Sequence, residues 1–316
     1  MTLELKNVAA VENGEKDQII GHLCWYSIGE DNYEREELRK ALLQNGFEED
    51  DLPNEIRASD AFRRATKDIE TKRVETKQEG VYKNYIVRNV STNEKFIQRN
   101  IVEETVDSKG KKLSYKENEA ILFFNRDNEN MSKAVIEAGG LAEELAEEAC
   151  KLFEVYKTCH NGQAVRYMAN DILKSMSPTP VRPSGGVYFI PAKHEDKLRR
   201  LVNLVSSLSK GEAFMIPLIR TDENQDMLQR KLLEHLQSTL VSCQELAKQD
   251  SVPAAQFKML ANEAKRVISD MADYREIITE ALDKMDSYQE LIKGAIQALL
   301  DKAAEIPDKR KKDAKI

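Results

Sequence analysis

The chain is poor in the residues that disulfide scaffolds, fibres and metal sites need. Its 316 residues include four cysteines, four histidines, 13 glycines and eight prolines. The cysteines, Cys24, Cys150, Cys159 and Cys243, form no C-x-x-C pair, which argues against a zinc site and a disulfide framework. With 41% hydrophobic and 33% charged residues, the composition excludes a disordered or fibrous chain and favours a largely helical globular protein.

Long hydrophobic runs are absent as well. No stretch approaches the about 18 consecutive apolar residues of a membrane-spanning helix, and the start MTLELKNVAA lacks the basic and apolar parts of a secretion signal. We therefore expect a cytoplasmic protein that makes no membrane contact.

The motifs of nucleotide and metal enzymes are missing too. SGGVYF at 184–189 lacks the G-x-G-x-x-G spacing and leads into a predicted strand, and no G-x-x-x-x-G-K-[ST] occurs. The four histidines stand apart, without an H-E-x-x-H pair. Cys159 and His160 are neighbours in sequence, but adjacency alone is not the geometry of a nucleophile and its base. We expect no catalytic residue, no metal and no cofactor, and hence no enzyme.

What the sequence does contain is a separation of charge. The formal net charge is −7, yet residues 57–116 hold 15 Lys and Arg against 9 Asp and Glu, and residues 160–220 hold 9 against 4. The acidic total therefore does not exclude a basic face of the kind that nucleic-acid contact requires, although charged runs are most often plain solvated surface.

Hydrophobic periodicity predicts an α+β protein that is mainly helical. The expected parts are a small antiparallel β meander, a central module that is winged-helix-like or small α/β, and a long C-terminal antiparallel helical hairpin that forms a coiled coil. The predicted domains are an N-terminal helical region at 1–78, the meander at 79–127, a helix with the central module at 128–221, the coiled-coil hairpin at 222–305 and a basic disordered tail at 306–316.

The predicted hairpin has an unpaired seam. Apolar residues from Phe257 to Leu299 alternate steps of three and four, as in a helix of about six heptads, while the preceding helix covers only 223–249. The seam beyond Ile278 would outrun its partner, so it must be buried by the helix predicted at 129–159 or by a second copy of the chain. The second alternative predicts a homo-oligomer.

The predicted meander mixes aromatic and basic residues. Ring faces stack on unpaired bases while cations follow phosphates, so this mixture suits a platform for single-stranded nucleic acid. The alternative is that aromatic residues in strands form the core. The aromatic residues are Tyr82, Tyr85, Phe96, Tyr115, Phe123 and Phe124, and the basic ones are Lys83, Arg88, Lys95, Arg99, Lys111 and Lys112.

The central module carries the predicted nucleic-acid contacts. A helix expected from Asn161 to Met176 has an apolar stripe and an opposite polar face, and PVRPSGGVYFIP at 180–191 reads as an edge strand, a tight turn and a second strand. This order resembles a winged helix-turn-helix, with Arg182 on the wing. The alternative is a plain α/β scaffold, in which residues 188–190 form a buried strand. The predicted contacts are Gln163, Arg166, Tyr167, Asn170, Lys174, Arg182, Lys193, Lys197 and Arg200.

The layout, with DAFRRAT at 60–66 and RPSGGVYFIP at 182–191, resembles an uncharacterised family of bacteriophage and plasmid proteins of Gram-positive bacteria. The resemblance implies an accessory role on a mobile element, in the cytoplasm of a bacterial host. Two functions follow as hypotheses. The first is non-enzymatic binding of DNA or RNA, with self-association through the coiled coil. The second is a protein-interaction module that inhibits or triggers a host defence complex by direct contact.

Overall fold

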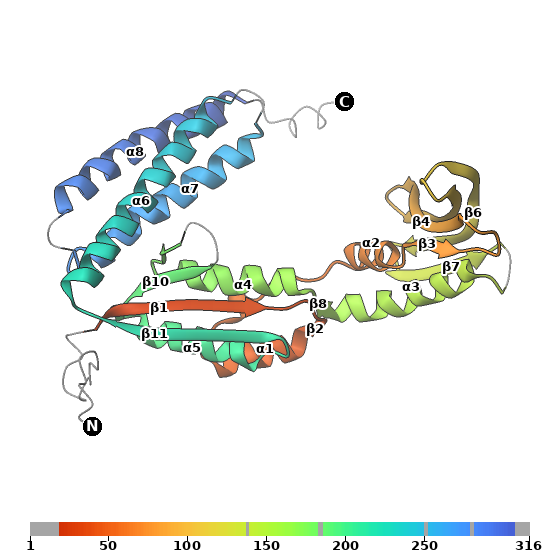
Figure 1. Ribbon diagram of the computed structural model, residues 1–316, viewed down its shortest axis with the longest axis horizontal. Coiled ribbons are helices and arrows are strands. Elements are labelled where there is room, and N and C mark those ends of the chain that lie inside the picture. The colour runs from red at the N-terminus through yellow and green to blue at the C-terminus, as the bar shows by residue number, and fades with distance from the viewer. Residues whose placement is uncertain (1–18, 137–138, 183–185, 250–251, 279–280, 307–316) are drawn as a thin grey trace. The chain divides into compact units, whose positions relative to one another are not determined.

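The computed structural model describes residues 19–136, 139–182, 186–249, 252–278 and 281–306. These residues form eight α-helices and two main β-sheets, and the chain divides into two units (Figure 1). Unit 1 comprises residues 1–29, 44–47 and 168–316, and unit 2 comprises residues 30–43 and 48–167. Each unit has its own sheet and its own hydrophobic core.

Unit 1 is built on a four-stranded sheet in the order β11-β1-β10-β9. Its strands are β1 (Ile19–Ile28), β9 (Thr179–Pro180), β10 (Val187–Pro191) and β11 (Gly211–Ile219). β1 pairs antiparallel with both β10 and β11, so these two run parallel, joined by α5 (Glu195–Ser207) in a split β-α-β arrangement. A Cβ atom at Gly21 would lie 2.3 Å from the carbonyl oxygen of Ile190, so glycine is required where β1 and β10 approach.

The central segment is not a winged helix. α4 (Gly162–Lys174) leads into the β9–β10 hairpin, and Pro180 lies on the edge strand as predicted, but β10 is an inner strand of the sheet that pairs with β1. Phe189 and Ile190 are fully buried, and α5 and β11 follow, as in the alternative α/β arrangement. The strands of a wing pair with strands nearby in the sequence. β10 pairs instead with β1, near the start of the chain, as well as with β9, and so lies inside the sheet.

The C-terminal region is a three-helix bundle, not a long hairpin. Its helices are α6 (Asp222–Ala247), α7 (Ala254–Asp270) and α8 (Leu282–Glu305). Where the sequence predicts one continuous helix, α7 ends at Asp270 and a 3₁₀ turn follows at 271–274. The next helix, α8, packs against both α6 and α7. The break was missed because no glycine or proline marks residues 271–281 and the apolar spacing continues through them.

The bundle removes the structural argument for self-association. Ile278, Met285, Ile292 and Leu299 of the predicted unpaired seam are buried in one core with residues of α6 and α7. The seam is therefore covered within the chain. A homo-oligomer stays a prediction, but it no longer has this basis.

Unit 2 contains the predicted meander as a five-stranded antiparallel sheet in the sequential order β3-β4-β5-β6-β7. Its strands are β3 (Thr71–Glu75), β4 (Val81–Thr92), β5 (Phe96–Asp107), β6 (Lys112–Asn125) and β7 (Asn130–Val135). β7 occupies the start of the helix predicted at 129–159, which begins only at Leu141, after Gly139 with its positive φ of 84°. The sheet is therefore larger than the predicted meander at both ends.

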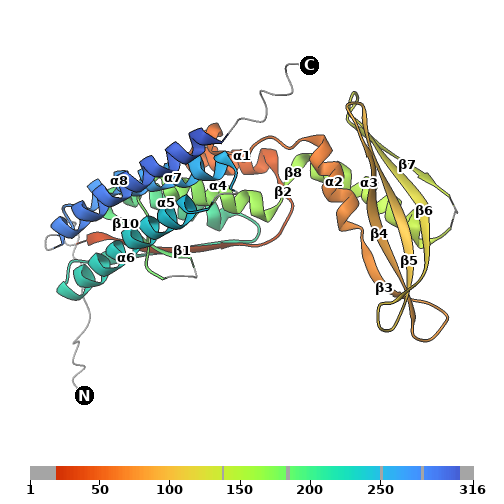
Figure 2. The same ribbon diagram turned by 90° about the horizontal axis from the view of Figure 1, so that it is seen from above.

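Helices cover one side of this curled sheet (Figure 2). They are α2 (Ala58–Asp68) and α3 (Leu141–Thr158). The ring of Phe124 on β6 lies between them, with its centroid 5.5 Å from that of Phe62 and 5.9 Å from that of Phe153. Unit 2 also holds α1 (Arg35–Gln44), except for its last residue, and a small two-stranded sheet of β2 (Tyr33–Glu34) and β8 (Cys159–His160).

Candidate functional site

The five-stranded sheet has a second face that lies opposite α2 and α3. Tyr85, Ile101 and Phe124 belong to the core beneath the helices. Successive strand residues point to opposite faces, so the residues between these core positions form the second face, which we call the open face. It is the face on which a site could be built without displacing a helix.

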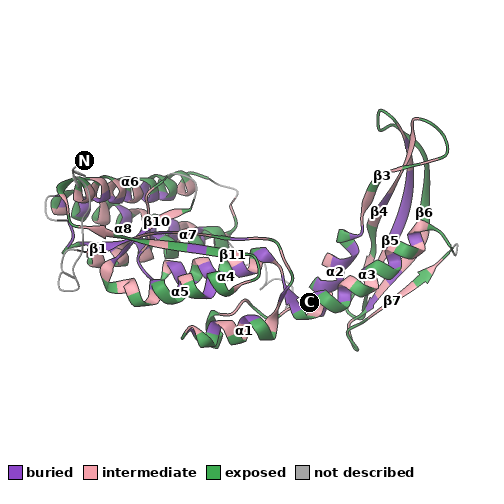
Figure 3. Ribbon diagram, turned by 60° about the horizontal axis from the view of Figure 1, so that its bottom comes forward, coloured by how far each residue is buried: buried purple, intermediate pink, exposed green. Residues whose placement is uncertain are grey.

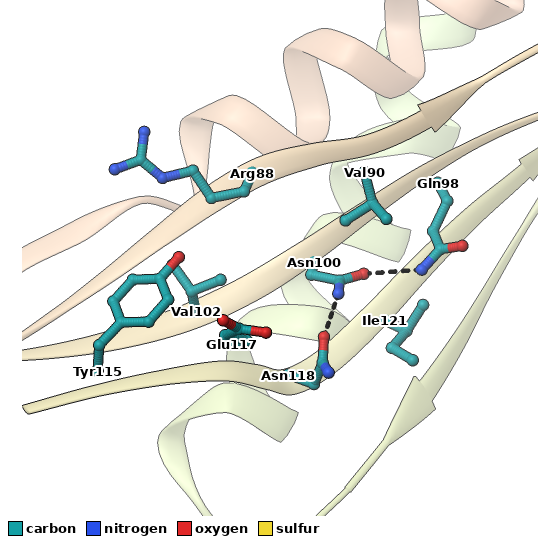
Figure 4. Close-up of a pocket in the computed structure, with 9 residues that line it drawn as sticks. All are labelled: Arg88, Val90, Gln98, Asn100, Val102, Tyr115, Glu117, Asn118 and Ile121. Atoms are coloured by element: carbon teal, nitrogen blue, oxygen red, sulfur yellow. Dashed lines mark hydrogen bonds between the residues drawn. The ribbon is translucent and has the colours of Figure 1, made fainter.

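A cavity of about 400 Å³ hollows the open face. Figure 4 shows the side chains that line it, which come from β4, β5 and β6. Val90, Val102 and Ile121 provide apolar walls, and three of the six polar lining residues are amides. The lining residues are Arg88, Val90, Gln98, Asn100, Val102, Tyr115, Glu117, Asn118 and Ile121.

Irregular strand pairing explains why the sheet is hollow at this point. In the register of β5 with β6, Val102 alone stands opposite three residues of β6, 117–119. A second irregularity in β4 lies at Val90. Bulges of this kind bend a strand and increase its local twist. Glu117 and Asn118 belong to the bulged segment and reach the cavity from it (Figure 4).

Three amide side chains, Gln98, Asn100 and Asn118, form a hydrogen-bonded row in the cavity (Figure 4). Gln98 Nε2 donates to Asn100 Oδ1 at 3.1 Å, and Asn100 Nδ2 donates to Asn118 Oδ1. Asn100 is only 6% exposed although it lies on the open face. Both hydrogen bonds run in the same direction along the row. The carbonyl oxygen of Gln98 at one end and the amino group of Asn118 at the other therefore take no part in them.

The charges at the rim of the cavity are partly neutralised. The buried carboxylate of Glu104 lies 3.5 Å from the Arg88 guanidinium and 2.6 Å from Lys112 Nζ. A buried carboxylate needs such partners to remain charged. Lys112 Nζ also lies 5.9 Å from the centre of the Tyr115 ring, which is 45% exposed. The rim therefore offers two cations, one carboxylate and an accessible aromatic ring.

The structure divides the aromatic residues of the meander between the two faces. Tyr85 and Phe124 are buried beneath the helices, as the core alternative predicted. The other four follow the alternation onto the open face, where the ring centroids of Phe96 and Phe123 are 6.4 Å apart. The open-face aromatics are Tyr82, Phe96, Tyr115 and Phe123.

The basic residues of the meander are divided in the same way. Arg88 and Lys112 lie at the rim of the cavity on the open face. The remaining four lie elsewhere: Lys83 and Arg99 on the helix side, where they bond to Glu103 and Thr66, and Lys95 and Lys111 in hairpin turns. Six of the twelve residues of the predicted platform therefore lie on the open face, and their contact with nucleic acid stays a prediction.

The contacts predicted around α4 and α5 fall on both units. Gln163, Arg166 and Tyr167 belong to unit 2, and Asn170, Lys174, Arg182, Lys193, Lys197 and Arg200 belong to unit 1. The polar side of α4 is accessible, because Tyr167 is 61% exposed while Val165, Met168 and Ile172 of the opposite stripe are buried. Gln163 Nε2 donates to the Tyr167 hydroxyl at 3.0 Å.

Most of these predicted cations already have a partner within their own unit. Arg166 pairs with Glu30, Lys174 with Asp171, and Lys193 with Asp273. Arg200 donates to the carbonyl oxygen of Gly46 at 2.9 Å and lies over the ring of Phe47. Arg182 and Lys197 have no ion pair among the described residues. Whether any of these residues touches nucleic acid stays a prediction.

Sequence reasoning missed a polar cluster around Asp273 in unit 1. Its carboxylate accepts a hydrogen bond from Ser177 Oγ at 2.5 Å and lies 2.7 Å from His194 Nε2, with Lys193 as a third partner. Burial acts to raise the pKa of Asp273, but these three partners outweigh it and hold the pKa below its usual value. The serine hydroxyl donates to the carboxylate, not to the imidazole, so the cluster lacks the geometry of a nucleophile with its base.

The other candidate groups for chemistry are buried and unreactive. Burial raises the pKa of the Cys24 thiol to about 12, which leaves it protonated. Burial and the neighbouring Arg35 guanidinium lower the pKa of His160 to about 4, which leaves it neutral. In the part of the chain that the structure describes, no three His, Cys, Asp or Glu side chains come together as a metal site would need.

The fold and the cavity define an α+β protein with a hollowed, accessible sheet face. The chain belongs to a family of unknown function, DUF6744, whose family model matches residues 19–305. Comparison with curated proteins gave no match, and comparison with solved structures gave none either. No helix among the described residues is long and apolar enough to cross a lipid bilayer.

Proposed function

We propose that this protein binds single-stranded nucleic acid and is not an enzyme. The strand would lie across the open face of the five-stranded sheet. The observation that carries the proposal is the grouping at the cavity: an exposed Tyr115 ring, with Arg88 and Lys112 near it and amide side chains inside. Stacking of a base on such a ring contributes about 1–3 kcal/mol, and the cations follow the backbone. The rings need unpaired bases, because in a duplex each base face is covered by its neighbours.

Stacking should contribute more to this binding than charge does. Glu104 neutralises part of the positive charge of Arg88 and Lys112. Two cations that reach phosphates would give a slope of about −1.4 for the logarithm of affinity against the logarithm of salt concentration on a single strand. Such binding fits the accessory role on a mobile element that the sequence resemblance implies.

Fluorescence anisotropy with a labelled strand of about 15 nucleotides tests the proposal. A single strand should bind more tightly than a duplex of the same sequence, and Tyr115→Ala should weaken binding about tenfold through lost stacking. Phe214→Ala is the matched control, because it removes an exposed aromatic ring from unit 1 instead. Failure of every single strand to bind at low salt would refute the proposal.

A second candidate function is a protein-interaction module, which an exposed apolar patch on unit 1 favours. Trp25 and Phe214 have ring centroids 5.4 Å apart, and strand register places Ile216 on the same face. Phe214 is 44% exposed and Ile216 50% exposed. They belong to β11, which Figure 3 labels and colours by burial. Patches of this kind often mark protein interfaces. A host defence protein as partner predicts capture from a nuclease-treated host lysate, and loss of that capture when Phe214→Ser and Ile216→Ser are combined.

A further inference from the structure

We propose that the cavity on the open face is a base-selective pocket, which accepts a base with an amino group at purine position 6 or pyrimidine position 4 and rejects a base with a carbonyl there. Adenine and cytosine belong to the first class, and uracil, thymine and guanine to the second. The inference rests on the proposed function, because it assumes a single strand on the open face. It adds a role for the amide row and for Glu117.

The size and lining of the cavity suit a base with part of its sugar. Its volume of about 400 Å³ falls within the range of about 300–1,000 Å³ that is usual for small-molecule pockets. Val90, Val102 and Ile121 form the apolar part of the lining (Figure 4), and the face of a planar ring would pack against them. Six of the nine lining residues carry polar groups, and three of these six form the hydrogen-bonded amide row.

The amide row supplies a donor and an acceptor that are already held in place. Asn100 is fixed by hydrogen bonds to both Gln98 and Asn118, so the row loses little conformational freedom when a ligand enters. Its unused carbonyl oxygen can accept from an amino group, and its unused amino group can donate to a ring nitrogen. The unused oxygen belongs to Gln98 and the unused amino group to Asn118, at opposite ends of the row, so each makes a single hydrogen bond to a ligand.

Glu117 distinguishes between the two classes of base. Its carboxylate lines the cavity in the same bulged segment as Asn118, and an ionised carboxylate can only accept hydrogen bonds. An amino group of adenine or cytosine can donate to it. A carbonyl oxygen of uracil or thymine would face it as a second acceptor. A base edge paired in this way is typically favoured about tenfold or more over the wrong base.

Homopolymer strands test the pocket by fluorescence anisotropy on the full chain. Adenine and cytosine tracts should bind about tenfold more tightly than thymine or uracil tracts, in DNA and in RNA. Glu117→Gln keeps the shape of the side chain and adds a donor, so it should improve binding of thymine and uracil tracts until the preference falls to about threefold or less. Glu94→Gln, an exposed residue of the β4–β5 turn, is the matched control and should retain the full preference.

A second variant distinguishes a loss of base selectivity from a loss of folding. Asn118→Ala removes an exposed side chain, so the circular dichroism spectrum should stay unchanged while the preference declines. Equal binding of all tracts, or an unchanged preference in both Glu117→Gln and Asn118→Ala, would overturn the pocket and leave the proposed function standing. Absence of binding to every tract would overturn both.

Discussion

The two sheets of the molecule differ in what covers them. In unit 1, α5 packs against β1 and β11, and Phe189 of β10 lies in one core with the helices of the bundle. In unit 2, the two helices of the core cover a single face, and the opposite face holds the cavity, the amide row and accessible aromatic rings. The sheet of unit 1 packs against α5 and the bundle and leaves Phe214 and Ile216 exposed, whereas the sheet of unit 2 keeps a helix-free face where substitutions should cost little stability.

The largest effect expected from this difference concerns Phe189 in unit 1. Its ring is fully buried, with its centroid 6.0 Å from that of Tyr274, and removal of a core phenylalanine costs about 3–5 kcal/mol of unfolding free energy. Val90→Ala on the open face, where Val90 is 53% exposed, should cost about 0.5 kcal/mol or less. Urea denaturation of Phe189→Ala and Val90→Ala compares the two, and equal losses would contradict the distinction between the sheets.

The second effect is a dependence of unit 2 on pH. The pKa of His160 is lowered to about 4 in the folded chain, while a histidine in the unfolded chain has a pKa of about 6.5. The unfolded state therefore binds more protons between these values, and stability should fall by up to about 3 kcal/mol as the pH drops through this range. In unit 1, burial likewise lowers the pKa of His22 and of His235, so their protonation also reduces stability, whereas the contribution of Asp273, whose pKa is below its usual value, is lost only at lower pH.

Thermal unfolding at about pH 7 and about pH 4.5 measures this loss. His160→Gln cannot take up the proton, so its melting temperature should depend less on pH than that of the unmodified chain. The same pH profile in both chains would show that another group is responsible.

The smallest effect concerns the charge at the rim of the cavity. Glu104→Gln removes the carboxylate that lies beside Arg88 and Lys112, and leaves both cations available to phosphates. Affinity for a single strand should rise by about two- to fivefold at low salt, with a steeper salt dependence. Glu94→Gln again serves as the control for net charge. Weaker binding of Glu104→Gln would indicate that the carboxylate positions the two cations, so that the open face needs it.

Local patterns predicted the sheet of unit 2 but not that of unit 1. β4, β5 and β6 follow one another in the sequence, and their side chains alternate between the two faces as in ordinary strands. Their residues therefore predict a meander. The sheet of unit 1 depends on Trp25 pairing with Phe214 and Cys24 with Tyr188. These partners are far apart along the chain, and no local pattern in one sequence reveals such a pairing.

The candidate site was predicted in part for the same reason. The exposed ring of Tyr115 and the cations Arg88 and Lys112 belonged to the predicted platform. The amide row did not, because Asn118, which accepts a hydrogen bond from Asn100, belongs to the bulge at 117–119 that local patterns do not reveal. The prediction of one long C-terminal helix was wrong for a different reason. Apolar residues spaced three and four apart indicate which side of a helix is buried, but they do not indicate whether the helix is continuous.

The position of β1 between β10 and β11 has a consequence for synthesis. β1 leaves the ribosome early, but its neighbours are complete only when Ile219 has been added. The strands of unit 2 are complete at Val135 and its covering helix at Thr158. Contacts between distant segments form slowly, because a long loop must close first. The nascent chain therefore carries β1 as an unpaired strand while the whole of unit 2 is made, and a chaperone that shields apolar strands would act in this interval.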